Sequence, residues 1–268
     1  MTLSDTVIAT ITTQAGDSRY AKAAQDYAFA LSQALGARLR IIALWGEDTV
    51  PKDIDAEQVA EEAAQNIVEK AKAAGIVVVE SGRGDKDGLL EEARMSDLFV
   101  VGMPTDQDLT EDDEMATRIQ ERERPLLHEA ECSVLVVSKP PPRPIANVLV
   151  NYQGGIEGKS ALRVAGELGI GCLSKVTVLS IHGDIGQASV MGQTAEEYLS
   201  VFNVAQLNVL EKEGPSDSWV DIKEVAKECQ ADLVILGEDP YGLLDRFLSR
   251  NIGERMAEAT DLPVLLAR

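Results

Sequence analysis

The sequence predicts an α/β protein made of two tandem doubly wound modules, each a five-stranded, mainly parallel sheet flanked by helices. Three observations lead to this prediction. Short apolar runs alternate with helical segments, several of these runs recur in the same order, and a proline-rich segment separates the two sets. Runs of Val, Ile and Leu without strict alternation are typical of strands that are buried on both faces of a parallel sheet.

In the first copy, strand-like runs alternate with apolar residues at helical spacing. The clearest helix covers 19–35, where Tyr27, Leu31 and Leu35 recur on one face. We expect helices at 19–35, 56–74, 88–95 and 121–129. The expected strands lie at 7–11, 39–44, 76–80, 98–101 and 134–137.

The second copy repeats these elements in order. Its strands are expected near 148–152, 176–181, 204–210, 233–236 and 264–267, and its helices near 158–168, 194–202, 218–229 and 251–259. The matching segments are 6–13 with 147–154, 34–48 with 171–184, 97–102 with 232–237, and 133–139 with 263–268. Repetition of this kind indicates duplicated units, so we expect modules at 1–139 and 147–268. The proline-rich linker at 140–146 is short and stiff, which favours two modules that pack together.

Composition excludes several classes of function. The formal charge of −20, from 45 acidic and 25 basic residues, disfavours binding to nucleic acid or to anionic membrane surfaces. The scattered cysteines, Cys132, Cys172 and Cys229, do not form a disulfide framework, and with only His128 and His182 beside them they do not form a zinc site. No membrane span or signal-peptide pattern is present, so we expect a cytoplasmic protein without a metal.

The second copy resembles the universal stress protein family. The resemblance rests on Gly237 after the fourth strand, a following helix that bears Glu254 and Arg255, and the closing segment 262–265. It covers nearly the whole chain in two copies. It implies modules of the adenine nucleotide alpha hydrolase-like kind, which form dimers, or an internal pseudo-dimer when two modules share one chain. Some members of the family bind ATP and others do not.

The resemblance also indicates where a ligand would bind. ATP-binding members carry a glycine loop after the fourth strand and an aspartate after the first, since glycines let backbone amides approach phosphates. In the second copy Gly237 keeps the first glycine position, whereas Pro240 replaces the second, and Gln153 takes the aspartate position. Arg250 could hold a phosphate by itself or be a surface arginine. The candidate ligand-binding residues of this copy are Gln153, Gly154, Gly155, His182, Gly237, Arg250 and Asn251.

The first copy departs further from the ATP-binding pattern. Thr105 stands at the second glycine position after Gly102, and Thr12 stands at the aspartate position. The acidic loop at 106–114 would repel a triphosphate unless divalent cations intervened. We expect this segment to be a solvated loop. The alternatives are that it binds Ca²⁺ or Mg²⁺ weakly or that it contacts a basic partner. The candidate cleft residues of this copy are Thr12, Thr13, Trp45 and Gly102.

These observations predict a non-catalytic, cytoplasmic stress-response regulator or binding module with degenerate ATP-binding loops. No serine or cysteine nucleophile lies in a recognisable elbow near His182, so no catalytic residue is assigned. Its partners are expected to be a protein, a second copy of itself or a small ligand. The first alternative is a protein that binds or weakly hydrolyses ATP in the second module. The second alternative is a regulatory partner of a membrane transporter.

Overall fold

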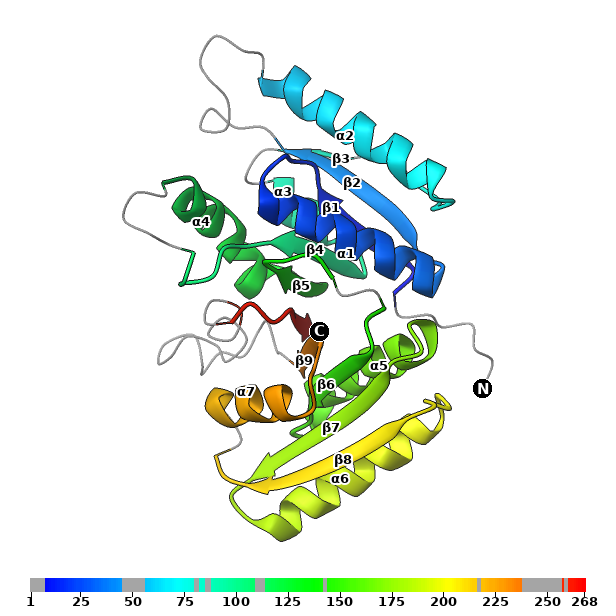
Figure 1. Cartoon of the computed structure of the whole chain (residues 1–268), viewed down its shortest axis with the longest axis vertical. Coiled ribbons are helices and arrows are strands. Elements are labelled where there is room, and N and C mark those ends of the chain that lie inside the picture. Colours follow the sequence, from blue (N-terminus) through cyan, green and yellow to red (C-terminus); the bar gives the residue numbers. More distant parts are fainter. Residues whose placement is uncertain are drawn as a thin grey trace. The chain divides into compact units, whose positions relative to one another are not determined.

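The computed structural model describes residues 8–44, 56–79, 82–84, 88–108, 114–141, 144–215, 218–237, 257 and 260–268. They form two compact units, Ile8–Pro141 and Pro142–Arg268, which we call the N-terminal and C-terminal modules (Figure 1). Among these residues, no helix is long and apolar enough to cross a membrane.

The N-terminal module is a parallel sheet with the strand order β3-β2-β1-β4-β5. The strand order reverses beside β1, since β2 and β4 flank it on its two sides. Helix α1 packs on β1, β2, β4 and β5, and α2 packs on β2. The strands are β1 (Thr10–Gln14), β2 (Arg38–Leu44), β3 (Gly82–Gly84), β4 (Leu98–Gly102) and β5 (Ser133–Val137). The helices are α1 (Arg19–Leu35), α2 (Ala56–Ala73), α3 (Gly88–Ala93) and α4 (Glu114–Glu129).

The C-terminal module repeats this arrangement, with the strand order β10-β9-β6-β7-β8 and parallel pairing throughout. Helix α5 packs on β6, β7, β9 and β10, and α6 packs on β7 and β8. The strands are β6 (Asn147–Asn151), β7 (Lys175–His182), β8 (Leu207–Glu213), β9 (Leu233–Gly237) and β10 (Val264–Ala267). The helices are α5 (Gly155–Gly171), α6 (Ile185–Ser200) and α7 (Trp219–Glu228). The predicted α/β fold with parallel sheets is confirmed.

The two modules begin with the same capping interaction. The carboxylate of Asp97 accepts the backbone N–H groups of Ala9 and Thr10, and Asp232 accepts those of Ala146 and Asn147. Thr10 therefore corresponds to Asn147, which agrees with the register of each first strand on the second. The sequence alignment of 6–13 with 147–154 is thus wrong by four residues.

The reason for this error is that β1 continues beyond the apolar run. Its threonines are buried, and their branched side chains fit a strand. Their hydroxyl groups, however, make the segment after the apolar run resemble a loop in the sequence. The strand was expected at 7–11 but covers Thr10–Gln14. Thr12 consequently lies inside β1, and Gly16, not Thr12, corresponds to Gln153.

Several other elements differ from the prediction. Helix α6 begins at Ile185, earlier than the expected 194, because Asp184 caps it and Gly192 lies inside it against β8. Helix α4 likewise begins at Glu114 instead of 121. In the expected third strand at 76–80, Val78 forms only an isolated bridge with Leu39. Of the expected helix at 251–259, only residue 257 belongs to the described part of the chain.

Candidate functional site

A cavity of about 370 Å³ lies at the carboxyl ends of β6 and β9 in the C-terminal module. These two strands are neighbours where the strand order of the sheet reverses, which is where ligands bind in open α/β sheets. The volume is within the range of small-molecule sites, roughly 300–1,000 Å³. The described lining residues are Asn151, Gln153, Gly154, Gly155, Glu157, Gly158, Leu236 and Gly237.

Two successive glycines shape the turn between β6 and α5. Gly154 and Gly155 have φ angles of 83° and 74°, a region of backbone conformation that other residues rarely adopt. Gly154 is also the N-cap of α5 and supplies no side-chain acceptor to the first turn. The first turn of α5 therefore has no side-chain cap for its backbone N–H groups, and Gly155, Glu157 and Gly158 of this turn line the cavity.

Gly237 has a structural reason that is independent of any ligand. A Cβ atom there would lie 2.3 Å from the carbonyl oxygen of Glu157 in the first turn of α5. Gly102 occupies the same place at the end of β4, where a Cβ atom would lie 2.0 Å from the carbonyl oxygen of Tyr20 in α1. Both glycines are thus required for the close approach of a helix to the fourth strand of each module, whether or not a nucleotide binds.

Four described lining residues were not predicted from the sequence, namely Asn151, Glu157, Gly158 and Leu236, and the first two are polar. Asn151 is 5% exposed, and its Oδ1 atom has no hydrogen-bond partner within the described structure. Glu157 lies in the first turn of α5, and its carboxylate is so close to Gly155 that a Cβ atom there would be 2.8 Å from Oε2. The signals were present in the sequence, since Asn151 ends an apolar run and Glu157 lies two residues after the paired glycines.

The electrostatics of this cavity are unusual for a phosphate site. Glu157 places a negative charge on the helix end that would otherwise attract an anion. No lysine or arginine is among the described residues that line the cavity. Tyr20 and Glu157 correspond in the two modules, so the counterpart of Arg19 is Ile156, whose side chain is uncharged and 79% exposed.

The structure brings together part of the predicted C-terminal site. Gln153, Gly154, Gly155 and Gly237 line one cavity. His182 ends β7 and is not among the described lining residues, and its Nε2 atom has no partner within the described structure. Trp45, Arg250 and Asn251 lie outside the described residues.

In the N-terminal module, the predicted threonines do not form an open cleft. Thr12 and Thr13 are fully buried in β1, and the Thr12 hydroxyl hydrogen-bonds with that of Ser96. The placement of Thr12 after the first strand is therefore wrong, for the register reason given above. Gly102 is buried against α1 and is likewise closed to a ligand from that side.

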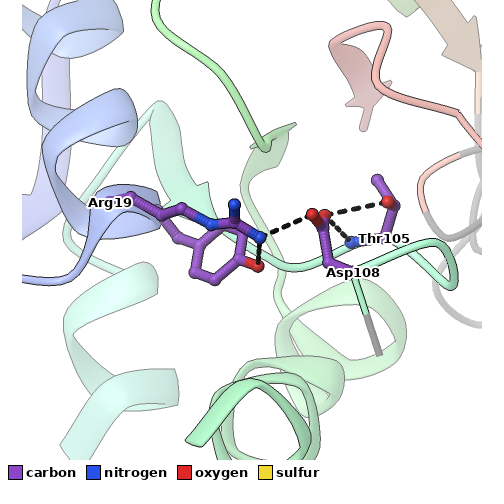
Figure 2. Close-up of polar contacts among 4 residues, drawn as sticks. Arg19, Thr105 and Asp108 are labelled. Atoms are coloured by element: carbon purple, nitrogen blue, oxygen red, sulfur yellow. Dashed lines mark hydrogen bonds and ion pairs between the residues drawn. The ribbon is translucent and has the colours of Figure 1, made fainter. Parts of the chain in front are cut away.

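A polar cluster of Arg19, Thr105 and Asp108 joins the start of α1 to the segment that follows β4 (Figure 2). The backbone N–H and the hydroxyl group of Thr105 both donate to Asp108 Oδ2 at 2.9 Å. Arg19, the first residue of α1, contacts Asp108 Oδ1 through Nη2 at 2.5 Å. Burial by itself would raise the pKa of Asp108, but the Thr105 hydrogen bonds and the Arg19 charge outweigh it and hold that pKa below its ordinary value.

This cluster changes the interpretation of the acidic loop. Asp106 is exposed, as a solvated loop requires, but Asp108 is anchored to α1 and to Thr105. Glu111, Asp112 and Asp113 lie outside the described residues. In the part of the chain that the structure describes, no group of three or more His, Cys, Asp or Glu residues is arranged to hold a metal ion.

Comparison with known proteins identifies the fold. No protein-family model matches the sequence, and no curated protein matches it. Among solved structures, a universal stress protein from Archaeoglobus fulgidus has a TM-score of 0.75 at 15% identity, with 97% of this chain and 96% of that chain covered. A functionally unknown protein from Pseudomonas aeruginosa PAO1 has a TM-score of 0.60 at 18% identity, with coverage of 97% and 92%.

A third similar structure is the cytoplasmic domain of a prokaryotic cation chloride cotransporter. Its TM-score is 0.57 at 13% identity, with 97% of this chain and 95% of that chain covered. At these identities the likenesses establish the fold. Over nearly its full length, the chain resembles universal stress proteins.

Proposed function

We propose that this chain is a tandem protein of the universal stress type that acts as a non-catalytic regulator, through contacts with a protein or a small ligand. The observation that carries the proposal is the Asp108 cluster of the N-terminal module. There the N–H and hydroxyl groups of Thr105 and the guanidinium of Arg19, the groups best suited to hold a phosphate, already hold the protein's own carboxylate.

The C-terminal module supports the same proposal by a different route. Its cavity keeps the glycines that would let a phosphate approach the backbone, but the carboxylate of Glu157 lies among them. The exposed Ile156 stands where the other module has Arg19, and the described residues that line the cavity include no lysine or arginine. Like charges at close range in a partly enclosed site disfavour a triphosphate. In this proposal both modules keep the scaffold of a nucleotide site, and a carboxylate in each module disfavours binding of a nucleotide there.

Calorimetry with ATP and Mg²⁺ tests this proposal. At a protein concentration of about 100 µM, which is high enough to detect weak complexes, we expect no heat of binding. A dissociation constant below about 10 µM would contradict the proposal. Release of ADP or phosphate at a rate above that of a heat-denatured sample would contradict the non-catalytic assignment.

The alternative is ATP binding in the C-terminal module. It is supported by the cavity itself, in which Gly154, Gly155 and Gly237 meet. In this alternative Arg250 would supply the cation that the described lining residues lack. If the calorimetry shows binding, Arg250→Ala should abolish it while leaving the far-UV circular dichroism spectrum unchanged. Retained affinity in that variant would exclude Arg250 as the phosphate ligand.

A second candidate function is regulation of a membrane transporter from the cytoplasmic side. It is supported by the likeness of fold to the cytoplasmic domain of a cation chloride cotransporter. The net charge of −20 would suit basic cytoplasmic segments of such a partner. Affinity purification from detergent-solubilised cells at low and high salt is the test. We expect a transporter to be recovered at low salt and lost at high salt, and its absence at low salt would contradict this candidate.

A further inference from the structure

We propose that the N-terminal module contains an anion-binding site that Asp108 keeps filled. The site consists of the Arg19 guanidinium and the backbone N–H and hydroxyl groups of Thr105, and its free form would take inorganic phosphate or a phosphate monoester. The inference rests on the proposed function, because it explains why a module of this fold would not bind a phosphate ligand. It goes further by naming the contact that closes the site and the ligand class that removal of the contact would admit.

Three donors from two distant segments converge on one carboxylate. Thr105 donates twice to Oδ2 at 2.9 Å, and Arg19 reaches Oδ1 at 2.5 Å, so each carboxylate oxygen has its own partner (Figure 2). Charge-assisted bonds of this kind are made equally well to a carboxylate or to a phosphate oxygen. Asp108 therefore occupies the place that two oxygens of a bound phosphate would take.

The backbone N–H and the hydroxyl group of Thr105 both need a hydrogen-bond acceptor, which the Asp108 carboxylate supplies. Thr105 is 1% exposed, so its hydroxyl and N–H groups have little access to water. Without the Asp108 carboxylate, these buried donors would lack an acceptor, and a small anion that entered would restore it. This need for an acceptor is what makes the position a binding site once Asp108 is removed.

The position of Arg19 is also fixed without Asp108. Its guanidinium lies over the Tyr20 ring, with 4.6 Å from Cζ to the ring centroid, and Nη2 donates to the Tyr20 hydroxyl. The first turn of α1 contains no acidic residue that could take over its charge. Arg19 would thus remain close to its present place and supply a preorganised cation to an incoming phosphate.

Tethering explains why the site stays closed in the unmodified protein. Asp108 lies three residues after Thr105, and the backbone N–H of Asp108 also donates to the Thr105 carbonyl oxygen at 2.8 Å. A tethered carboxylate acts at an effective concentration of about the millimolar range or above, so free phosphate at lower concentration cannot displace it. The site is therefore closed because the Asp108 carboxylate competes with free phosphate for the same donors, and this closure requires no large movement of the chain.

The test is a phosphate titration of Asp108→Ala by calorimetry, in parallel with the unmodified protein. We expect the variant to bind inorganic phosphate at least about tenfold more tightly than the unmodified protein does. Asp106→Ala is the matched control, because Asp106 is an exposed aspartate of the same segment and its loss should change nothing. The double variant Arg19→Ala/Asp108→Ala should lose the gain in affinity.

Asp108→Asn provides a second variant of the same size. Its neutral amide oxygen is a weaker acceptor for Thr105 than a carboxylate and no longer neutralises the Arg19 charge, so phosphate should displace it more easily. If Asp108→Ala does not fold, phosphate should raise the melting temperature of Asp108→Asn and leave that of the unmodified protein unchanged. Folded variants that bind phosphate no better than Asp106→Ala would overturn the inference. ATP binding by the unmodified protein would contradict the proposed function instead, so the two failures can be told apart.

Discussion

Gly237 lies so close to the backbone of Glu157 that a Cβ atom on it would be 2.3 Å from the Glu157 carbonyl oxygen. The same relationship holds between Gly102 and Tyr20 in the N-terminal module. Retention of the first glycine of a nucleotide loop is therefore weak evidence for a nucleotide, because the packing of α1 and α5 on the sheet already requires it. Gly102 and Gly237 are therefore evidence for the fold and do not indicate whether a nucleotide binds.

We predict that Gly237→Ala destabilises the protein whether or not any ligand is present. The added methyl group meets backbone atoms that cannot move independently, so the expected loss is about 1–3 kcal/mol. Urea denaturation followed by circular dichroism measures it. Gly183→Ala is the control, since no atom lies within 4 Å of its added Cβ and the expected change is within about 0.5 kcal/mol. Equal stability of the two variants would contradict the packing explanation.

The capping carboxylates make a second prediction. Asp232 accepts the N–H groups of Ala146 and Asn147 at 2.8 Å each, so Asp232→Ala leaves two backbone donors at the start of β6 without their acceptor. We expect a loss of about 1–3 kcal/mol in the free energy of unfolding. Asp97→Ala should behave alike in the N-terminal module. Glu196→Ala, at an exposed position of α6, is the control, and a similar loss there would show that general charge effects dominate.

How far the sequence predicts the fold depends on where the local signals lie. Helix α1 was predicted with its observed ends from the helical spacing of its apolar residues, and the structure adds the local reason for these ends, since Ser18 caps the start and Gly36 adopts the left-handed conformation at the end. Strand β1 was misplaced because its buried threonines resemble a loop. Helix α6 was predicted only in part, since glycines such as Gly192 weaken the helical signal although they are needed for packing.

The candidate site shows the same division. Gly154, Gly155 and Gly237 were found because glycines carry a backbone signal that is visible in the sequence. The contact between Arg19 and Asp108 could not be found that way, because the two residues are far apart in the chain and the fold alone brings them together. Local patterns thus predict turns and close approaches, whereas ion pairs across elements require the tertiary structure.

Glu123 gives a prediction about pH. Its side chain is fully buried in α4, and burial raises its pKa above the ordinary value of 4.5 in spite of the Arg122 guanidinium beside it. A carboxyl group whose pKa is higher in the folded state stabilises the fold while it is protonated, and this stabilisation is lost as the pH rises through the folded-state pKa. Glu123→Gln should therefore reduce the loss of stability above pH 4.5.

Urea denaturation of Glu123→Gln and of the unmodified protein across a pH series measures this effect. At the acid end the two proteins should be similar, and toward neutral pH the variant should be equally or more stable. If the variant is instead less stable at neutral pH, the carboxylate is ionised in the folded protein, and its pair with Arg122 contributes more than burial costs.

Cys172 gives a chemical prediction. Burial raises the pKa of its thiol to about 11, so little reactive thiolate is present at neutral pH. Iodoacetamide at pH 7.5 should label Cys172 slowly in the folded protein and readily after denaturation. The labelling rate of the folded protein should rise as the pH approaches 11. Fast labelling at neutral pH would contradict a raised pKa for this thiol.

The last prediction transfers the cation of one module to the other. The C-terminal cavity has the glycine turn of a phosphate site but has Ile156 and Glu157 where a cation and an uncharged residue would be needed. The double variant Ile156→Arg/Glu157→Gln places at α5 the charge that Arg19 supplies at α1 and removes the carboxylate beside Gly155. We expect it to bind ATP at least about tenfold more tightly than the unmodified protein in calorimetry.

The control is Ile156→Gln/Glu157→Gln, which removes the Glu157 carboxylate without adding a positive charge and so shows how much of the gain in affinity comes from the arginine. If neither variant binds ATP, charge is not what closes this cavity to nucleotides. Pro240, three residues after Gly237 in the sequence, then becomes the first residue to replace, because it lacks the N–H that a glycine would offer to a phosphate.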